Sequence, residues 1–228
     1  MSEQQFDLMR QQMILEVVAE TVFLTPQLGK AALNARVIDA MARIPRHEFV
    51  PVELRPYGYL NRPLPIGCGK TISQPFIVAL MTDLLDPQPS DVVLEVGAGV
   101  GYQAAILAEL VKQVYSIELI EELARDAERR LQRLGYRNVE VRTGNGYYGW
   151  PEHAPFDKII VTAAPDLFPP PLIAQLKPCG RMVIPAGIPD TQQLVLVEKT
   201  EDGKLLTKEI LPVRFSELDE GGDYAGMA

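Results

Sequence analysis

From residue 92 onward, short β-rich runs alternate with helix-like stretches or loops, and this alternation constrains the fold more than any other feature. The first four runs are VVLEVG (92–97), QVYSIEL (113–119), NVEVRTG (138–144) and DKIIVTAA (157–164). Strands that alternate with helices pair in parallel. Three more runs follow, GRMVIPAG, QQLVLVEKT and KEILPVRF, and only the turn at EDGK separates the last two, which predicts an antiparallel hairpin. The sequence therefore predicts an α/β fold with a doubly wound, mostly parallel, seven-stranded sheet and helices on both faces.

The residues before this alternation have a different character. Residues 1 to about 50 predict an N-terminal helical extension, because apolar residues recur there at intervals of three and four. From Phe49 to Ser73, four prolines and three glycines predict a long irregular segment that acts as a binding loop or lid, with a structureless connector as the alternative.

We expect residues 1–228 to form one domain. Within it, residues 1–85 form the helical and active-site loop segment, and residues 90–215 form the cofactor-binding sheet core. The final stretch, SELDEGGDYAGMA (216–228), is expected to be frayed.

Composition argues against several classes of function. The net charge is −8 and no Lys/Arg block stands out, which argues against nucleic acid or an anionic membrane surface as a partner. No apolar run approaches the roughly 20 residues of a spanning helix, and the N-terminus mixes acids with glutamines, so we expect a cytoplasmic protein. Two distant cysteines and two histidines make a metal site improbable.

A glycine-rich turn follows the first strand of the predicted sheet. That strand ends in LEVGAGVGYQAA, with glycines at 97, 99 and 101. Glycine permits a sharp turn and the close approach of a ligand, and ligands of open parallel sheets bind beyond the carboxyl ends of the strands. Tyr102 stands where a dinucleotide fingerprint has its third glycine, which disfavours a nicotinamide oxidoreductase. A purely structural turn is the alternative to a ligand-binding loop.

Two polar residues extend this candidate site. Glu118 ends the second strand, where a carboxylate can accept hydrogen bonds from the hydroxyls of a ribose, with a solvated strand end or a helix cap as the alternative. Asn145 lies between two glycines after the third strand, where it suits a turn and can equally bind the edge of an adenine. Together the three loops predict a nucleoside pocket.

These residues resemble the class I S-adenosylmethionine-dependent methyltransferases and, more narrowly, the protein-L-isoaspartate O-methyltransferases. The narrower resemblance covers roughly residues 30–190. It rests on MARIPRHEFVP, PLPIGCGKTISQP, VLEVGAGVGYQAAILA, VYSIEL and GYYGWPEHAPFDKIIVTAA. The ISQP and APFD boxes are more specific than the glycine loop, which all class I methyltransferases share.

The resemblance implies repair of damaged proteins and peptides by methylation of the free α-carboxylate of L-isoaspartyl residues. It implies S-adenosyl-L-methionine as the cofactor and S-adenosyl-L-homocysteine as the product. It places the catalytic Ser73 at the substrate carboxylate, Gly97 and Gly99 under the methionine part of the cofactor, and Glu118 on the ribose. A monomer without a metal is expected. The full candidate sets are Glu95, Gly97, Gly99, Gly101, Glu118, Leu119, Asn145 and Gly146 for the cofactor, and Ile72, Ser73 and Gln74 for the substrate.

Ser73 also has a local interpretation. It directly precedes Gln74-Pro75, and proline is tolerated in the first helical turn, so we predict that Ser73 is the N-cap of a helix. A helix N-terminus attracts carboxylates, so the capping role and the substrate-binding role are compatible. In this hypothesis the hydroxyl and neighbouring backbone N–H groups hold the substrate carboxylate against the cofactor methyl group.

Several positions depart from the family pattern. Gly144-Asn145-Gly146 replaces the usual Gly-Asp-Gly, Tyr59-Leu60-Asn61 replaces Tyr-x-Asp, and Cys179 replaces a glycine. After PVRF, Ser216-Glu217-Leu218 replaces Val-Pro-Leu. Because the end of that strand helps to hold the peptide in the family, two alternatives stay open. One is a different acceptor, such as an aspartate in a dedicated peptide or a small carboxylate, and the other is a non-catalytic cofactor-binding module.

Overall fold

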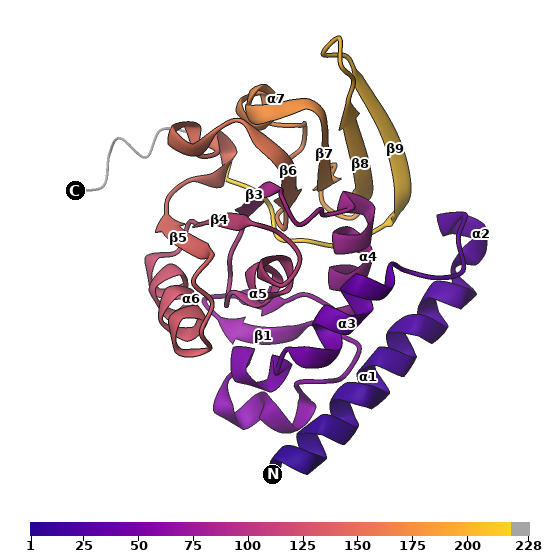
Figure 1. The fold of residues 1–228 in the computed structure, drawn as a ribbon, viewed down its shortest axis with the longest axis vertical. Coiled ribbons are helices and arrows are strands. Elements are labelled where there is room, and N and C mark those ends of the chain that lie inside the picture. The colour runs from indigo at the N-terminus through magenta and orange to yellow at the C-terminus, as the bar shows by residue number, and fades with distance from the viewer. Residues whose placement is uncertain (220–228) are drawn as a thin grey trace.

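The fold is built on one seven-stranded sheet (Figure 1), and the computed structural model describes residues 1–219. The strand order is β5-β4-β3-β6-β7-β8-β9; pairing is parallel from β5 to β7, whereas β7–β8 and β8–β9 pair antiparallel. The strand bounds are β3 Val92–Val96, β4 Gln113–Glu118, β5 Val139–Thr143, β6 Phe156–Val161, β7 Leu176–Ala186, β8 Gln193–Lys199 and β9 Leu205–Pro212. The predicted mostly parallel sheet and the hairpin at EDGK are confirmed.

The sheet has a hydrophobic core on each face. Successive residues of a strand point to opposite faces, so each strand contributes side chains to both cores. Val93 belongs to a core formed with α1 and α3 to α6, whereas the next residue, Leu94, belongs to a second core that includes Trp150 and Phe156. The α-helix bounds are α1 Glu3–Phe23, α2 Thr25–Leu28, α3 Ala35–Arg43, α4 Pro75–Leu85, α5 Tyr102–Ala108, α6 Glu121–Arg133 and α7 Pro170–Gln175. The 3-10 helices are η1 Arg46–Phe49, η2 Val52–Tyr57, η3 Gly146–Tyr148 and η4 Pro151–His153.

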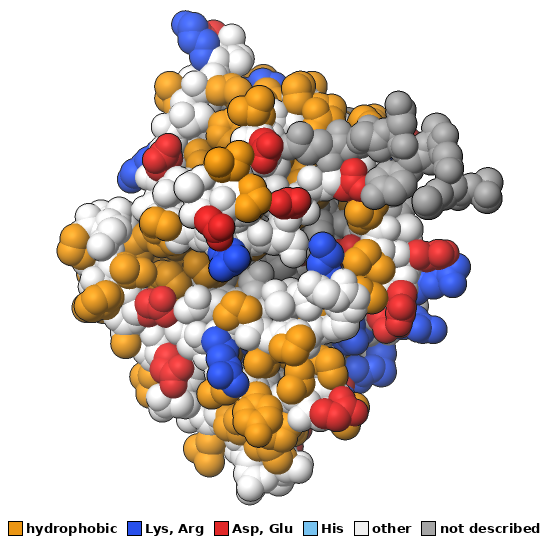
Figure 2. Space-filling model, turned by 180° about the vertical axis from the view of Figure 1, so that it is seen from behind, with side chains coloured by type: hydrophobic (Ala, Val, Ile, Leu, Met, Phe, Trp, Pro, Cys, Tyr) orange, Lys and Arg blue, Asp and Glu red, His pale blue; other side chains and the backbone are white. Residues whose placement is uncertain are grey.

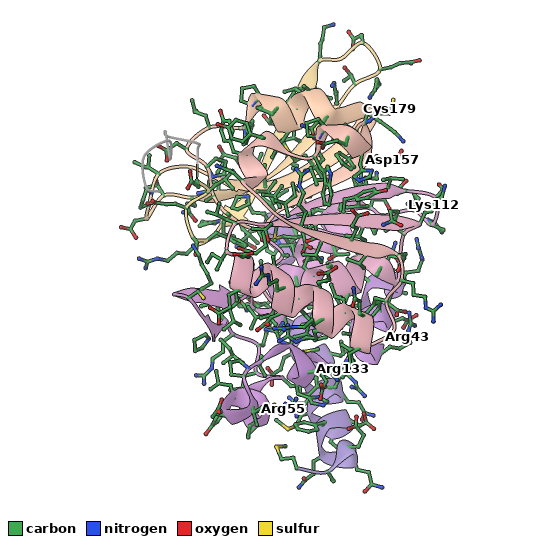
Figure 3. All side chains as sticks on the ribbon, turned by 90° about the vertical axis from the view of Figure 1, so that its left-hand side faces the viewer. Arg43, Arg55, Lys112, Arg133, Asp157 and Cys179 are labelled. Carbon is green, nitrogen blue, oxygen red and sulfur yellow. The ribbon has the colours of Figure 1, made fainter. Side chains whose placement is uncertain are left out.

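The N-terminal helices dock through their apolar faces. Phe6, Met13 and Val17 of α1 are buried in the core that also contains residues of the sheet. Figure 3 shows Arg43, Arg55 and Arg133 in the part of the molecule formed by the N-terminal elements and α6; Arg133 and Arg55 both pair with Glu48, at 2.7 and 3.4 Å. Exposed ion pairs contribute only about 0–1 kcal/mol each. Burial of the apolar face of α1 therefore contributes most of the free energy that holds the N-terminal helices to the rest of the fold.

The segment from Phe49 to Ser73 is more regular than predicted. It contains η2 and an antiparallel hairpin of β1 Leu64–Gly67 and β2 Lys70–Ile72, with Leu64 opposite Ile72. Cys68 lies at the tip of the hairpin with a φ angle of 53°. The expectation of a segment without regular structure was wrong, because strands of three and four residues are too short to show an alternating pattern.

The start of the predicted frayed end packs against the sheet. Phe215 N donates to Gln192 Oε1 at 2.6 Å, and Gln192 Nε2 donates back to Phe215 O at 3.1 Å. Ala164 N donates to Ser216 O, and Leu218 N donates to Ala164 O, both at 2.8 Å. The expectation of fraying was therefore wrong for residues 216–219, whose backbone follows the end of β6; residues 220–228 lie outside the described part of the chain.

Three further observations concern partners and chemistry. Within residues 1–219, no helix combines the length and the apolar character needed to cross a bilayer, and no three metal-ligating side chains form a cluster. Cys68 and Cys179 are exposed free thiols. On the face shown in Figure 2, basic side chains are interspersed with acidic ones, with apolar side chains between them.

His47 predicts a pH dependence of stability. Its ring stacks on Phe6 with centroids 3.7 Å apart, its Nδ1 lies 2.8 Å from the Tyr59 hydroxyl, and the side chain is buried. Burial lowers the pKa of His47, partly offset by Glu48. An unfolded histidine has a pKa of about 6.5, so the unfolded chain binds this proton more readily than the folded one. The contribution of neutral His47 to the free energy of unfolding is therefore complete above pH 6.5. It is lost as the pH falls through the pKa of His47 in the folded state.

We therefore expect urea unfolding to show falling stability between pH 7.5 and 5.5, with a smaller fall in His47→Gln. The contribution of one proton is at most about 1.4 kcal/mol per pH unit. An equal pH slope in the variant and the wild-type protein would contradict the assignment.

Candidate active site

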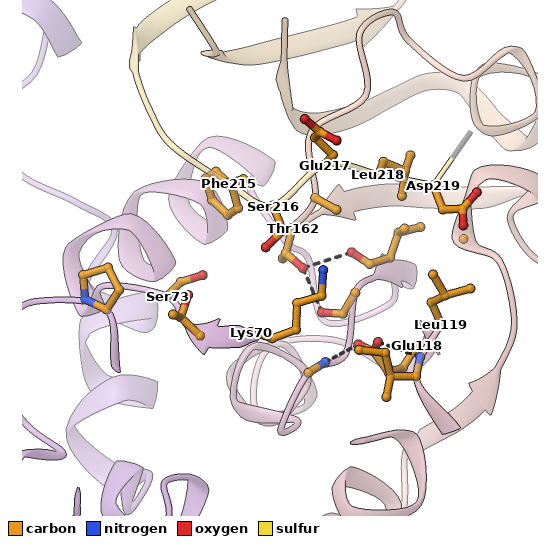
Figure 4. A pocket seen from close by; sticks show the side chains of 18 of the residues that line it. Lys70, Ser73, Glu118, Leu119, Thr162, Phe215, Ser216, Glu217, Leu218 and Asp219 are labelled. Atoms are coloured by element: carbon orange, nitrogen blue, oxygen red, sulfur yellow. Dashed lines mark hydrogen bonds between the residues drawn. The ribbon is translucent and has the colours of Figure 1, made fainter. Parts of the chain in front are cut away.

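A cavity of about 630 Å³ lies at the carboxyl ends of the parallel strands (Figure 4). Its walls come from the β1–β2 hairpin, the start of α4, the loops after β3, β4, β5 and β6, and the segment 212–219. Sites for small molecules commonly have volumes of about 300–1,000 Å³. The volume therefore suits a nucleoside-sized ligand together with part of a second molecule.

The loop after β3 needs its glycines for different reasons. Gly97 has a φ angle of +96°, and a Cβ there would lie 2.3 Å from Thr162 Oγ1. The Thr162 hydroxyl donates to the carbonyl oxygens of Val96 (3.1 Å) and Gly97 (2.8 Å), so the loop is held against the end of β6. Gly97 and Gly99 line the cavity. Gly101 does not; it is the N-cap residue of α5, and a Cβ there would press on Leu131 of α6.

Glu118 is buried at the end of β4 and reaches the glycine loop. Its Oε2 accepts from Gly99 N at 2.7 Å, and its Oε1 accepts from Ile120 N at 3.0 Å. A carboxylate has about four acceptor positions, so these two bonds leave about two for a ligand. Glu118 and Leu119, two of the residues predicted to bind the cofactor, both line the cavity.

Glu95 lies behind this loop, away from the cavity. Its side chain is fully buried, the Ser116 hydroxyl donates to its Oε2, and its Oε1 has no partner among the described residues. Burial raises the pKa of Glu95 to about 8, and the nearby Glu118 adds to this effect. The structure therefore does not bring Glu95 to the cavity wall, and Ile72, another of the predicted site residues, also lies outside the lining.

Asn145 has the turn role that the sequence left open, and its contact with an adenine stays a prediction. Its Oδ1 accepts from Tyr147 N at 2.9 Å and so caps η3, which is the turn role. The residue also lines the cavity beside Gly146, where a Cβ would lie 2.3 Å from Val96 Cγ1. Gly146 is thus required by packing against β3.

The start of α4 differs from the sequence prediction. The helix begins at Pro75 with Gln74 as the N-cap residue, and no side chain of Ser73 or Gln74 caps it. Instead, Asn61 Oδ1 accepts from Phe76 N at 3.0 Å. The predicted capping role of Ser73 was wrong, because Asn61 supplies the cap from a distant part of the chain. Ser73 lines the cavity, and its hydroxyl forms no hydrogen bond with any residue in 1–219.

Asn61 also explains one departure from the family pattern. Its Nδ2 donates to Glu20 Oε2 at 2.7 Å, and Gln74 Nε2 donates to the same carboxylate at 3.1 and 3.3 Å. An aspartate at position 61 would keep the capping oxygen but place a second carboxylate beside Glu20. The amide avoids that repulsion, and Glu20 of α1 fixes the side chain of Gln74 at the cavity.

Arg46 is not part of the cavity lining, but it holds the backbone of Ser73. It is fully buried; its Nη2 donates to Ser73 O at 2.7 Å and its Nε donates to Gly58 O at 2.9 Å. The guanidinium carbon lies 4.6 Å from the centre of the Tyr102 ring. Burial lowers the pKa of Arg46. The motif MARIPRHEFVP thus reaches the ISQP box through the Arg46 side chain.

Sequence reasoning missed Lys70 and Thr162 as parts of the cavity wall, whereas it expected the end of the last strand, within the segment 212–219, to contact the peptide only through the family resemblance. Thr162 directly follows a strand, which is a usable signal for a residue at this edge of a parallel sheet. Lys70 and the segment 212–219 gave no local signal, because their place depends on the hairpin and on Gln192.

This sheet, the glycine loop, Glu118 and the cavity define a class I S-adenosylmethionine-dependent methyltransferase. The sequence model of the family Protein-L-isoaspartate(D-aspartate) O-methyltransferase (PCMT) matches residues 21–222. The chain belongs to this family.

Relatives and solved structures agree with this membership. The chain is 63% identical over 220 residues to protein-L-isoaspartate O-methyltransferase 1 of Polaromonas sp., covering 96% of this chain and 93% of that protein. It is 60% identical over 213 residues to protein-L-isoaspartate O-methyltransferase 2 of Syntrophobacter fumaroxidans, covering 93% and 86%. A solved protein-L-isoaspartate O-methyltransferase has a TM-score of 0.78 at 29% identity, over 91% of this chain and 65% of that one. The predicted family, fold class, cofactor and activity are thereby confirmed.

Proposed function

We propose that this chain transfers a methyl group to the free α-carboxylate of L-isoaspartyl residues in damaged proteins and peptides, and that Ser73 holds that carboxylate. One observation carries the proposal. The Ser73 hydroxyl lines the same cavity as the glycine loop and Glu118, and no residue in 1–219 occupies its hydrogen-bonding capacity. A polar group in such a position is available to a ligand.

The residues of the cavity fit the cofactor. The Gly97 position has no room for a side chain, the Glu118 carboxylate has unused acceptor positions, and Asn145 and Gly146 form the next loop. We assign Glu118 and Leu119 to the ribose end, Asn145 and Gly146 to the adenine, and Gly97 and Gly99 to the methionine part. When bound, S-adenosylmethionine supplies an electrophilic methyl group on a sulfonium sulfur.

The acceptor needs no general base. A carboxyl group of this kind has a pKa of about 3.5 and is ionised at neutral pH, so no proton has to be removed. The task of the chain is to exclude water and align the carboxylate, and orientation of this kind can contribute on the order of 7 to 11 kcal/mol. Ser73 donates its hydroxyl proton to one carboxylate oxygen, while Arg46 and Gln74 keep the Ser73 backbone in place. Phe76 N is engaged by Asn61, so that amide is not part of the carboxylate site.

We further infer that the chain acts as a single-domain monomer in the cytoplasm. The core that buries α1 and α3 also contains sheet residues, which supports one unit across the 1–85 and 90–215 segments. The glycine loop, Glu118 and Ser73 already meet in one cavity of a single copy, so one copy is expected to suffice for activity. Exposed free cysteines suit a reducing compartment.

The experiment that tests the acceptor uses labelled S-adenosylmethionine and two synthetic peptides that differ only in one residue, L-isoaspartate or L-aspartate. A small dicarboxylate serves as a third acceptor. We expect label only in the isoaspartyl peptide. Equal labelling of the aspartyl peptide, or labelling of the small dicarboxylate alone, would contradict the proposed substrate.

A further inference from the structure

Lys70 is a cation that reaches into the cavity and has no counter-ion among residues 1–219. It begins β2, and Figure 4 shows its side chain extending into the cavity toward Thr162, between Ser73 and Glu118. Its ammonium forms no hydrogen bond or ion pair with any residue in 1–219. Lys70 also lines an adjoining groove of about 800 Å³ that follows the segment 214–219. It therefore stands at the border between the cavity and the groove.

Four other charged residues line the cavity: Glu118, Arg214, Glu217 and Asp219. Glu217 and Asp219 also line the groove, and neither forms an ion pair with Lys70. The Glu118 carboxylate accepts from Gly99 N and Ile120 N. Arg214, the other cation of the lining, is 86% exposed and pairs with Asp190 at 3.3 Å. A half-buried ammonium without an acidic partner in the protein is available to pair with an anion that enters the cavity, and such charge-assisted hydrogen bonds are strong. The position of Lys70 thus indicates an anionic ligand.

We propose that Lys70 recruits the α-carboxylate of the isoaspartyl residue and presents it to Ser73. The inference rests on the proposed function and names one more residue of its acceptor site. Lys70 and Ser73 are three residues apart on one wall, and Lys70 also faces the groove through which a peptide can reach that wall. The amino-acid carboxylate of the cofactor is the other possible source of the same chemistry, and the experiment separates the two.

Lys70 should affect binding of the peptide more than the chemical step. Methylation converts the carboxylate into a neutral ester, so the attraction to Lys70 is present for the substrate and absent for the product. The ammonium also stabilises the negative charge that must attack, so it favours binding more than it favours the chemical step. Lys70 should therefore lower KM for the peptide and contribute little to kcat, or even reduce it.

The kinetic test compares Lys70→Met, Lys70→Arg and the control Lys112→Met, which removes an exposed lysine outside the cavity. At low ionic strength, Lys70→Met should raise KM for the isoaspartyl peptide about tenfold, as for the loss of a charged hydrogen bond, with kcat changed less than about threefold. Lys70→Arg should restore most of the affinity, and Lys112→Met should match the wild-type protein. Added salt should raise KM of the wild-type protein more than that of Lys70→Met.

The binding test asks which carboxylate Lys70 recognises. Calorimetry with S-adenosylhomocysteine present compares the isoaspartyl peptide with the same peptide carrying an α-carboxamide. The wild-type protein should prefer the acid about tenfold, and Lys70→Met should prefer neither. Methylthioadenosine lacks the carboxylate of S-adenosylhomocysteine. The ratio of the affinities for these two compounds should be the same in the wild-type protein and in Lys70→Met.

Three results would overturn the inference in distinguishable ways. An unchanged preference for the acid in Lys70→Met removes Lys70 from the acceptor site. A selective loss of S-adenosylhomocysteine binding in Lys70→Met assigns the cation to the cofactor carboxylate. Failure of the wild-type protein to methylate the isoaspartyl peptide refutes the proposed function itself and the inference with it.

Discussion

Replacing Ser73 by alanine should lower kcat about 10- to 100-fold while the affinity for the cofactor changes less than about twofold. The reason is the free hydroxyl, which lines the cavity and has no protein partner in 1–219. Unlike the Lys70 ammonium, the directional Ser73 hydroxyl is proposed to fix which carboxylate oxygen faces the methyl group, so its loss lowers the rate of the chemical step. A hydrogen bond to a charged group contributes about 1.5–3 kcal/mol, which corresponds to this range of rates. Backbone contacts from Arg46 and Asn61 remain in the variant, so the fold of the ISQP box should be retained.

The measurement is steady-state methylation of an isoaspartyl peptide together with calorimetric binding of S-adenosylhomocysteine. Ser90→Ala, which removes an exposed hydroxyl in a turn away from the cavity, is the matched control. Equal losses of turnover and cofactor affinity in Ser73→Ala would show that Ser73 supports the whole pocket instead of the acceptor.

Arg46→Met should be the most damaging change to the scaffold of the site, with the free energy of unfolding lowered by about 2–3 kcal/mol. The substitution leaves the carbonyl oxygens of Gly58 and Ser73 without their donor, at about 1–3 kcal/mol for each buried group. Relief of the desolvated guanidinium offsets part of this loss. Because the carbonyl of Ser73 is one of the two acceptors, kcat should also fall at least tenfold in protein that remains folded.

Arg36→Met provides the control for Arg46→Met. Arg36 also donates to two backbone carbonyl oxygens, those of Pro87 at 3.0 Å and Leu110 at 2.9 Å, but it does not line the cavity. Urea unfolding should show a comparable loss of stability in both variants, whereas only Arg46→Met should lose turnover. If folded Arg46→Met keeps the wild-type kcat, Ser73 is positioned without Arg46.

The sheet could be predicted from the sequence because its strands carry short, strongly apolar runs, and parallel pairing follows from the intervening helices. The same logic placed Gly97 and Glu118 correctly at one edge, since both directly follow or end a strand. These are local signals joined by one topological rule. Lys70 and the segment 212–219 could not be placed in this way, because their positions depend on the hairpin fold and on the contacts of Gln192.

The surroundings of Ser73 show most clearly what a local sequence pattern cannot predict. The sequence pattern indicates Ser73 as the helix cap, but the capping oxygen belongs to Asn61, which Glu20 of α1 orients. Glu20 itself precedes residue 21, where the match to the family begins. No spacing rule connects these three residues; only the packing of α1 beside α4 brings them together.

The most direct test of the account is to locate the methyl group in a single peptide that offers competing carboxyl groups. The peptide carries one L-isoaspartyl residue, one ordinary aspartate and a free C-terminus, and mass spectrometry at mildly acidic pH preserves the ester. The account predicts one methyl group, on the isoaspartyl α-carboxylate. A methyl group on the aspartate or the C-terminus, or none at all from protein that binds S-adenosylhomocysteine, would contradict it.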